Sequence, residues 1–303
     1  MHPDAVSRTS HRGELGVSPG PADDSLRAVL ADAERELAAA GVASPRFDAE
    51  SLAAHVLGVQ RGHLVLKPRL DPAAERVLRV LVARRAAREP LQHLLGTAVL
   101  GPVEVAVGPG VFIPRPETEL LLEWGVARLH AVASPLVVDL CTGSAALALA
   151  IAALRPDAEV HAVELDPDAL AWARRNVAAH GGRVQLHASD VRASDLLPDL
   201  AGRVDLVVCN PPYVPDATPV PPEVRPGDPA VAVFGGPDGL AVIPDVVARA
   251  AALLRPGGAF AVEHDDTHAE AVPALLRAHR DLVDVAEHAD LNGRPRYATA
   301  RRR

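Results

Sequence analysis

The tetrapeptide Asn210-Pro211-Pro212-Tyr213 directly follows an apolar run, residues 204–209, that is typical of a buried parallel strand. A polar side chain at the carboxyl end of such a strand lies where open α/β sheets bind ligands. The two prolines lack N–H donors and fix φ, so the turn is rigid and its carbonyls stay available as acceptors. An amide carbonyl, a backbone carbonyl and the ring of Tyr213 together suit a planar NH2 group. The pattern therefore predicts a site that holds an amide or exocyclic amine nitrogen.

A second candidate element lies upstream, between a predicted strand at 136–140 and a predicted helix at 146–154. The turn between them, Cys141-Thr142-Gly143-Ser144-Ala145, is typical of the first half of a Rossmann-like unit. Gly143 permits a positive φ or the close approach of a ligand, and Ser144 is a candidate helix cap. A proline-rich turn that only closes a strand is the simpler interpretation of 210–213, and this upstream turn argues against it.

The predicted strand at 159–163 ends in Glu164, about twenty positions beyond the glycine turn, where a carboxylate accepts hydrogen bonds from ribose hydroxyls. The turn lacks the complete G-x-G-x-x-G of a pyrophosphate cradle. There is also no P-loop lysine, because Lys67 is the only lysine in the chain. A nucleoside without phosphates, such as S-adenosylmethionine, fits this pattern better than NAD or ATP.

With these motifs the chain resembles the release factor glutamine methyltransferases, the HemK/PrmC family of class I S-adenosylmethionine-dependent enzymes. The resemblance covers roughly residues 22 to 303, and the segment 112–119 (Phe-Ile-Pro-Arg-Pro-Glu-Thr-Glu) is more specific than the tetrapeptide, which DNA amine methyltransferases also carry. Further matching segments are 88–96, 235–240, 254–258 and 292–296. Cys141 and Ala145 depart from the family, which usually has glycine at both places. We expect the site to survive these departures, with the cofactor affinity affected.

The resemblance implies roles for individual residues. The side-chain carbonyl of Asn210 and the backbone carbonyl of Pro211 would accept hydrogen bonds from the two N–H groups of a substrate glutamine. Tyr213 would pack against the plane of that amide. The substrate-binding set is Asn210, Pro211, Pro212 and Tyr213, of which Asn210, Pro211 and Tyr213 are the catalytic candidates. The cofactor-binding set is Asp139, Cys141, Thr142, Gly143, Ser144, Ala145, Glu164, Asp190 and Asn210. Asp139 could instead cap the turn that follows it. Phe112, Arg115 and Glu117 would line or close the site, although Arg115 and Glu117 could equally brace two domains.

The same resemblance implies a Rossmann-like sheet of seven strands, the last antiparallel, joined by a β-hairpin to a small helical domain. Residues 1–22, rich in Pro, Ser, Gly and charge, are expected to form a disordered tail. Residues 23–90 are predicted to be helical, from apolar spacing over 26–37 and the start signals Ser44-Pro45 and Asp71-Pro72. In the family this domain helps to dock the protein substrate.

The residue pattern over 91–113 predicts a β-hairpin linker. Alternating predicted strands and helices over 114–303 indicate the methyltransferase domain. Its later predicted elements are strands at 184–188, 259–263, 282–286 and 296–300 and a helix at 270–278. The proline-rich stretch 214–239 is too long for an ordinary connection and is typical of a binding loop or lid.

Composition narrows the function classes. The formal net charge is −8 for 303 residues, and the sequence pI is about 5.9, which argues against direct nucleic-acid binding. We expect the local cluster Arg84, Arg85 and Arg88 to form a solvated helix face.

The two cysteines, Cys141 and Cys209, have neither metal-ligand nor disulfide-framework spacing, which indicates no metal site and a reduced, cytoplasmic protein. No apolar segment approaches 18 residues and no basic-then-apolar leader is present, so neither a membrane span nor a signal peptide is predicted.

The first functional hypothesis is N5-methylation of the glutamine in the Gly-Gly-Gln loop of peptide chain release factors. S-adenosyl-L-methionine would be the methyl donor and S-adenosyl-L-homocysteine the product. A ribosomal-protein glutamine N5-methyltransferase is the nearest alternative. A DNA adenine-N6 methyltransferase is disfavoured by the acidity and by the lack of a recognisable target-recognition domain. A catalytically silent translation-factor-binding protein is the fourth hypothesis, in which Cys141 and Ala145 mark a decayed cofactor turn.

Overall fold

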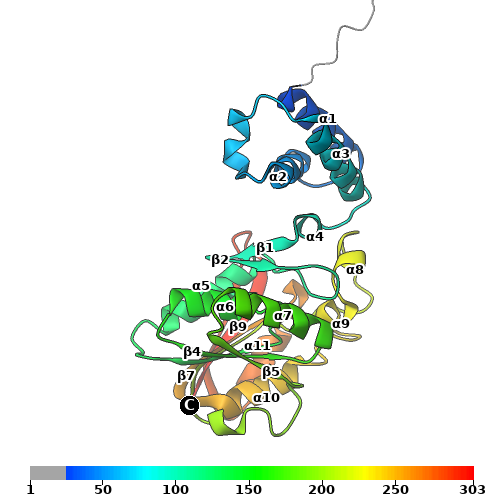
Figure 1. The fold of residues 1–303 in the computed structure, drawn as a ribbon. Helices are drawn as coiled ribbons and strands as arrows, with labels where there is room; N and C mark the ends of the chain where they lie inside the picture. Colours follow the sequence, from blue (N-terminus) through cyan, green and yellow to red (C-terminus); the bar gives the residue numbers. More distant parts are fainter. Residues whose placement is uncertain (1–24) are drawn as a thin grey trace, which may run out of the picture.

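The computed structural model describes residues 25–303, so the predicted tail, 1–22, lies outside the described residues (Figure 1). The N-terminal unit contains α1 (Leu26–Ala39), α2 (Pro45–Leu57), the 3-10 turn η1 (Arg61–Leu66), α3 (Pro72–Ala86) and α4 (Leu91–Leu95). The carboxylate of Asp71 caps α3 by accepting hydrogen bonds from the backbone N–H groups of Ala73 and Ala74, at 2.8 and 3.0 Å. The predicted apolar spacing holds, because the buried side chains of α1, α2 and α3 form one core.

The predicted hairpin occupies β1 (Thr97–Leu100) and β2 (Val103–Ala106), which pair antiparallel. The linker 91–113 begins with the short helix α4 and not with a strand. The physical reason is that Leu91 and Leu94, at helical spacing, are buried against the N-terminal core. Leu100 and Val105 of the hairpin are buried in the core of the larger unit instead. The hairpin therefore packs on the sheet unit while α4 packs on the N-terminal helices.

The larger unit is built on a seven-stranded sheet of order β5-β4-β3-β6-β7-β9-β8. Adjacent strands from β5 to β7 pair parallel, and β9 is antiparallel to both β7 and β8, so the last strand runs against the others as expected. The strands are β3 (Leu136–Leu140), β4 (Glu159–Glu164), β5 (Val184–Ala188), β6 (Val204–Cys209), β7 (Leu254–Glu263), β8 (Leu282–Ala289) and β9 (Pro295–Arg302).

Helices cover both faces of this sheet (Figure 1). α5 (Thr118–Arg128), α6 (Ala146–Leu154) and α7 (Pro167–Ala179) pack on one face, and α10 (Ile243–Leu253) and α11 (Ala271–Ala278) pack on the other. Successive strand residues alternate between the two cores: Val137 lies in the first, and Val138 lies in the second. Burial on both faces explains why the parallel strands are almost continuously apolar. The remaining elements are η2 (Pro198–Leu200), α8 (Val224–Gly227), α9 (Ala230–Val233) and η3 (Asp266–His268).

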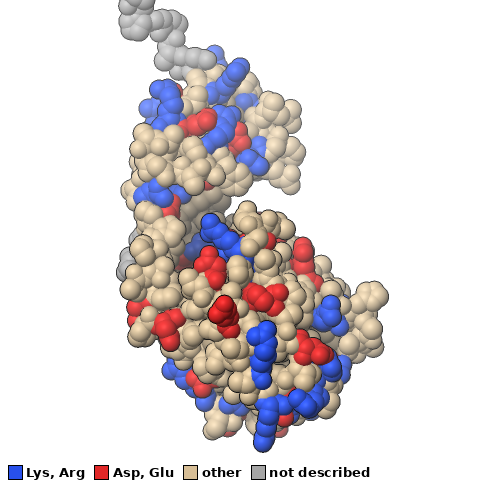
Figure 2. Space-filling model, turned by 180° about the vertical axis from the view of Figure 1, so that it is seen from behind, with Lys and Arg blue, Asp and Glu red and all other residues tan. Residues whose placement is uncertain are grey.

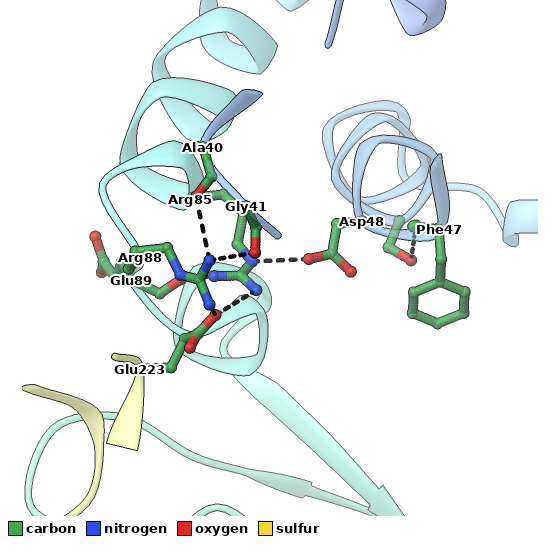
Figure 3. A network of polar contacts seen from close by, with 9 residues as sticks. Ala40, Gly41, Phe47, Asp48, Arg85, Arg88, Glu89 and Glu223 are labelled. Carbon is green, nitrogen blue, oxygen red and sulfur yellow. Dashed lines mark hydrogen bonds and ion pairs between the residues drawn. The ribbon is translucent and has the colours of Figure 1, made fainter. Parts of the chain in front are cut away.

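The N-terminal helices are tied to the larger unit by a polar network around Arg85 (Figure 3). Its guanidinium donates to Asp48 Oδ2 at 2.7 Å and to Glu223 Oε1 at 3.0 Å. Arg88 contacts the same Glu223 oxygen at 2.7 Å and donates to the carbonyl of Gly41 at 2.5 Å. Arg85 is only 7 % exposed, so the prediction of a solvated helix face is wrong for it. Its charge is buried because two carboxylates and the Glu89 carbonyl satisfy its donors.

The surface carries both signs of charge. On the face shown in Figure 2, acidic and basic side chains are interspersed, and the outline is indented between the N-terminal helices and the larger unit. Within residues 25–303, no helix is both long and apolar enough to cross a membrane.

Candidate active site

The candidate site lies where the order of the parallel strands reverses, between β3 and β6, at the carboxyl ends of the strands. This is the point at which open α/β sheets form a ligand crevice. A cavity of about 660 Å³ opens there. The sequence-predicted residues that line it are Phe112, Asp139, Cys141, Thr142, Gly143, Ser144, Glu164, Asp190, Asn210, Pro211, Pro212 and Tyr213. The parallel topology thus brings side chains from four separate strand ends into one cavity.

The turn after β3 winds through three left-handed residues. Cys141, Gly143 and Ala145 have φ of 58°, 58° and 65°. Glycine adopts this conformation without penalty, whereas Cys and Ala are strained in it. Nothing lies within 4 Å of the place that a Cβ on Gly143 would take, so the turn is open to a ligand there. Ser144 does not cap α6 as predicted, because the left-handed Ala145 takes the N-cap position and makes no side-chain cap.

Glu164, at the end of β4, organises this turn. Its carboxylate accepts hydrogen bonds from the backbone N–H groups of Gly143, Leu165 and Asp166, at 2.8, 2.9 and 2.8 Å. Burial raises the pKa of Glu164, and the three backbone hydrogen bonds partly oppose that rise. Asp190, after β5, also faces the cavity and accepts from the backbone N–H of Arg192 at 2.9 Å.

Asp139 of β3 is 1 % exposed and accepts a hydrogen bond from Thr142 Oγ1 at 2.5 Å. Burial raises its pKa to about 7, against the hydrogen bonds from Thr142 and from the backbone of Ala148. The Thr142 contact matches the alternative in which Asp139 caps the turn that follows it. Because Asp139 also lines the cavity, the contact does not exclude a cofactor role.

The opposite wall of the cavity carries the tetrapeptide and Thr118. Buried Glu263 does not line the cavity but contacts two of these residues, Thr118 and Tyr213. Neither Thr118 nor Glu263 has a predicted role. Asn210 Nδ2 donates to Thr118 Oγ1 at 3.1 Å, and the Tyr213 hydroxyl donates to Glu263 Oε1 at 2.8 Å. Burial raises the pKa of Glu263, while hydrogen bonds from Tyr213 and Thr118 and the charge of Arg296 oppose that rise. The sequence marks each residue singly and not their contact: Thr118 belongs to the specific segment 112–119, and Glu263 is an acid ending an apolar strand.

The long stretch 214–239 forms another wall of the cavity and includes the short helices α8 and α9. A parallel bridge between Val214 and Phe234 joins the start of this stretch to a residue near its end. Gly235 and Gly239 fit against the tetrapeptide backbone: an added Cβ would lie 2.6 Å from the Pro212 carbonyl oxygen at Gly235, and 2.2 Å from the Tyr213 carbonyl oxygen at Gly239. The glycine-rich segment 235–240 therefore supports the substrate side of the site by close backbone packing.

The structure places the three candidate site-lining residues, Phe112, Arg115 and Glu117, in different locations. Phe112 lines the main cavity, and the Arg115 guanidinium lies 5.1 Å from the centre of its ring. Arg115 forms an ion pair with Asp228 and lines a neighbouring cleft between the two units, not the main cavity. Glu117 is the N-cap residue of α5 and borders neither hollow. Of the three, the structure brings only Phe112 to the main cavity.

The strand order, the antiparallel β9 and a ligand cavity at the carboxyl ends of the parallel strands define a class I methyltransferase fold. Family models match in two places: the PrmC N-terminal domain over residues 28–96 and the methyltransferase small domain over residues 108–220. The release factor glutamine methyltransferase of Mycolicibacterium smegmatis is 55% identical, over 91% of this chain and 98% of its own. Those of Streptomyces coelicolor and Deinococcus radiodurans are 52% and 43% identical, each over 91% of this chain and 98% of their own.

The chain belongs to the release factor glutamine methyltransferase family.

Proposed function

We propose that this chain transfers a methyl group from S-adenosyl-L-methionine to the N5 nitrogen of the glutamine in the Gly-Gly-Gln loop of peptide chain release factors. The observation that carries the proposal is the sharing of one cavity by Asn210 and Pro211 with Gly143 and Glu164. One wall offers acceptors for an amide NH2 group, and the other offers an open turn beside a carboxylate. Family membership supports the release factor as the protein substrate.

The substrate side must activate a weak nucleophile, since the lone pair of an amide nitrogen is delocalised into its carbonyl. Asn210 Oδ1 and the Pro211 carbonyl would accept hydrogen bonds from the two N–H groups of the substrate amide. These fixed dipoles favour a nitrogen that becomes more tetrahedral and more positive as the methyl group arrives. Orientation supplies much of the remaining rate, because the rigid proline turn holds both acceptors in place. The amide nitrogen loses a proton only after the arriving methyl group has made it acidic, so no strong base is assigned.

The residues of the opposite wall fit the cofactor. A carboxylate has about four acceptor sites, and Glu164 uses three of them on backbone N–H groups, which leaves one for a ribose hydroxyl. Gly143 leaves room for close approach, and Asp190 would lie near the adenine. When bound, S-adenosyl-L-methionine supplies an electrophilic methyl group on a sulfonium, a good leaving group. The product would be S-adenosyl-L-homocysteine.

The partner and the location follow from this activity. The N-terminal helical domain, predicted at 23–90 and containing α1, α2 and α3, would dock the release factor. The net charge of −8 argues against direct binding to nucleic acid. A release factor is a translation protein, so we expect this chain to act in the cytoplasm, where Cys141 and Cys209 would stay reduced, as they are here.

Methyl transfer from labelled S-adenosyl-L-methionine distinguishes the four hypotheses. The protein is incubated separately with a release factor, with ribosomal proteins and with duplex DNA, and label in each macromolecule is counted. We expect label in the release factor alone, and none after its Gly-Gly-Gln glutamine is changed to alanine. Label in a ribosomal protein or in DNA instead would replace the proposed substrate. Calorimetry that detects no binding of S-adenosyl-L-methionine would indicate the silent binding protein.

A further inference from the structure

Thr118 Oγ1 lies between two groups of opposite hydrogen-bonding character. Asn210 Nδ2 approaches it at 3.1 Å, and it donates in turn to Glu263 Oε2 at 2.9 Å. Thr118 begins α5, Asn210 follows β6, and Glu263 ends β7, so three elements meet at this hydroxyl. Thr118 is 4 % exposed and Glu263 1 % exposed, which leaves little access for water to substitute for either contact.

When Glu263 is ionised, chemistry fixes the polarity of this chain of contacts. An ionised carboxylate only accepts hydrogen bonds, and a threonine hydroxyl carries a single hydrogen. Once that hydrogen points at Glu263, Thr118 Oγ1 offers only lone pairs to Asn210. The Asn210 carboxamide must then present its NH2 group to Thr118, which turns its oxygen to the other side. With the amide reversed, two acceptors would face each other in a buried place.

Glu263 also orients the second residue on the substrate side. Its other oxygen accepts the hydroxyl hydrogen of Tyr213 at 2.8 Å. One carboxylate therefore sets the direction of two hydroxyl groups, and through Thr118 it sets the Asn210 amide. This gives a physical reason for a buried acid at the end of β7 and for a threonine at the start of α5.

We propose that Thr118 and Glu263 are positioning residues that hold the Asn210 carboxamide with its oxygen free for the substrate amide. The identity of that substrate rests on the proposed function, but the orientation of Asn210 does not. In this relay of hydrogen bonds, Glu263 and Thr118 act on the substrate through the orientation of Asn210. Removal of the relay should therefore lower the turnover rate and leave cofactor binding unchanged.

The orientation can be tested without any substrate. The chain has three asparagines, Asn176, Asn210 and Asn292, so selective ¹⁵N-asparagine labelling gives three side-chain NH2 resonance pairs, and Asn210→Ala identifies the Asn210 pair. Thr118→Val keeps the shape and removes the acceptor, so the Asn210 pair should shift and its hydrogens should exchange faster with water. Thr118→Ser should restore the wild-type position. The Asn176 pair, bonded to the Ala106 and Ser144 carbonyls at 3.0 Å each, is the internal control and should not move.

The rate is measured on the same variants with an intact release factor. We expect Thr118→Val to lower kcat about 10- to 100-fold, less than the roughly 100- to 1,000-fold cost of removing a fixed dipole outright, because Asn210 itself stays in place. The affinity for S-adenosyl-L-homocysteine should change less than about threefold. Thr118→Ser should stay within about threefold of wild type. Glu263→Gln, which has one acceptor for two hydroxyl donors, should also lower kcat and shift the Asn210 pair.

An Asn210 pair that does not move in Thr118→Val overturns the relay, and so does a Thr118→Val enzyme with wild-type kcat. If wild-type protein fails to methylate a release factor, the proposed function fails, while the resonance measurement still decides the orientation of Asn210.

Discussion

The guanidinium of Arg85 on α3 contacts the carboxylate of Glu223 at 3.0 Å, although 138 residues separate the two in sequence. Glu223 precedes α8 in the stretch 214–239, whose later residues form a wall of the active-site cavity. Arg88 contacts the same carboxylate (Figure 3). One side chain thus connects the N-terminal helices with the segment that borders the substrate side of the site.

Glu223→Ala should weaken this connection. Arg85 keeps Asp48, so we expect a loss in the free energy of unfolding of only about 1–2 kcal/mol, measured by urea denaturation. The KM for an intact release factor should rise, while the affinity for S-adenosyl-L-homocysteine stays unchanged. Glu75→Ala removes the partly buried partner of the exposed Arg79 on the same α3 helix and should cost less than about 0.5 kcal/mol in the free energy of unfolding. Equal KM values for the two variants would contradict the coupling.

Ala145→Gly should stabilise the protein. Ala145 is held at φ 65°, and relief of that strain exceeds the greater chain entropy of glycine by about 0.5–1 kcal/mol. Ala152→Gly, inside α6, is the matched control and should destabilise by about 1 kcal/mol. Both changes are read from urea denaturation. A similar loss of stability in both variants would show that the left-handed turn costs nothing at Ala145.

Asp139→Asn should remove a pH dependence of stability. Burial raises the folded-state pKa of Asp139 from 3.8 to about 7, so its contribution is complete below the lower value and is lost as the pH rises through the higher one. Asparagine does not ionise. From pH 4 to pH 8, the free energy of unfolding of the wild type should therefore fall relative to the variant by about 3–5 kcal/mol. A difference that is constant with pH would show that Asp139 stays ionised in the folded cavity.

Gly239→Ala should impair catalysis through the tetrapeptide backbone. A Cβ there would lie 2.2 Å from the Tyr213 carbonyl oxygen, so the backbone of the substrate wall must shift. Gly202→Ala is matched in backbone, with φ of 69° against 77°, but its Cβ would meet nothing within 4 Å. Both variants should lose about 1 kcal/mol in the free energy of unfolding because of backbone strain. Only Gly239→Ala should also have a lower kcat. Comparable kcat values in the two variants would exclude a supporting role for this glycine.

Much of the frame of the site follows from the sequence. The apolar runs at 136–140 and 204–209 identify buried parallel strands, and a parallel sheet puts their carboxyl ends at one edge. That alone brings Asp139, Glu164 and Asn210 into one cavity, as the structure shows. The spacing of apolar residues is a local property, and the edge at which parallel strands end follows from the fold class. Both can therefore be predicted from a single sequence.

The contacts that orient these residues were beyond the sequence, because their partners lie far apart along the chain. Thr118 and Glu263 are 145 residues apart, and nothing in either neighbourhood indicates the other. The burial of Arg85 depends on Asp48 and Glu223, so a helix rich in arginine gave the wrong expectation of a solvated face. The positive φ at Cys141 and Ala145 is likewise set by the turn and not by the preference of those residues.

Peptide mass mapping of a release factor treated with wild-type protein and with Asn210→Ala tests the central claim most directly. The wild type should add the mass of one methyl group to the glutamine of the Gly-Gly-Gln loop. Asn210→Ala should lose about 3 kcal/mol of transition-state stabilisation and so methylate much more slowly. Calorimetry should show the binding of S-adenosyl-L-homocysteine little changed. Wild-type turnover by Asn210→Ala, or a methyl group on any residue other than that glutamine, would contradict the account.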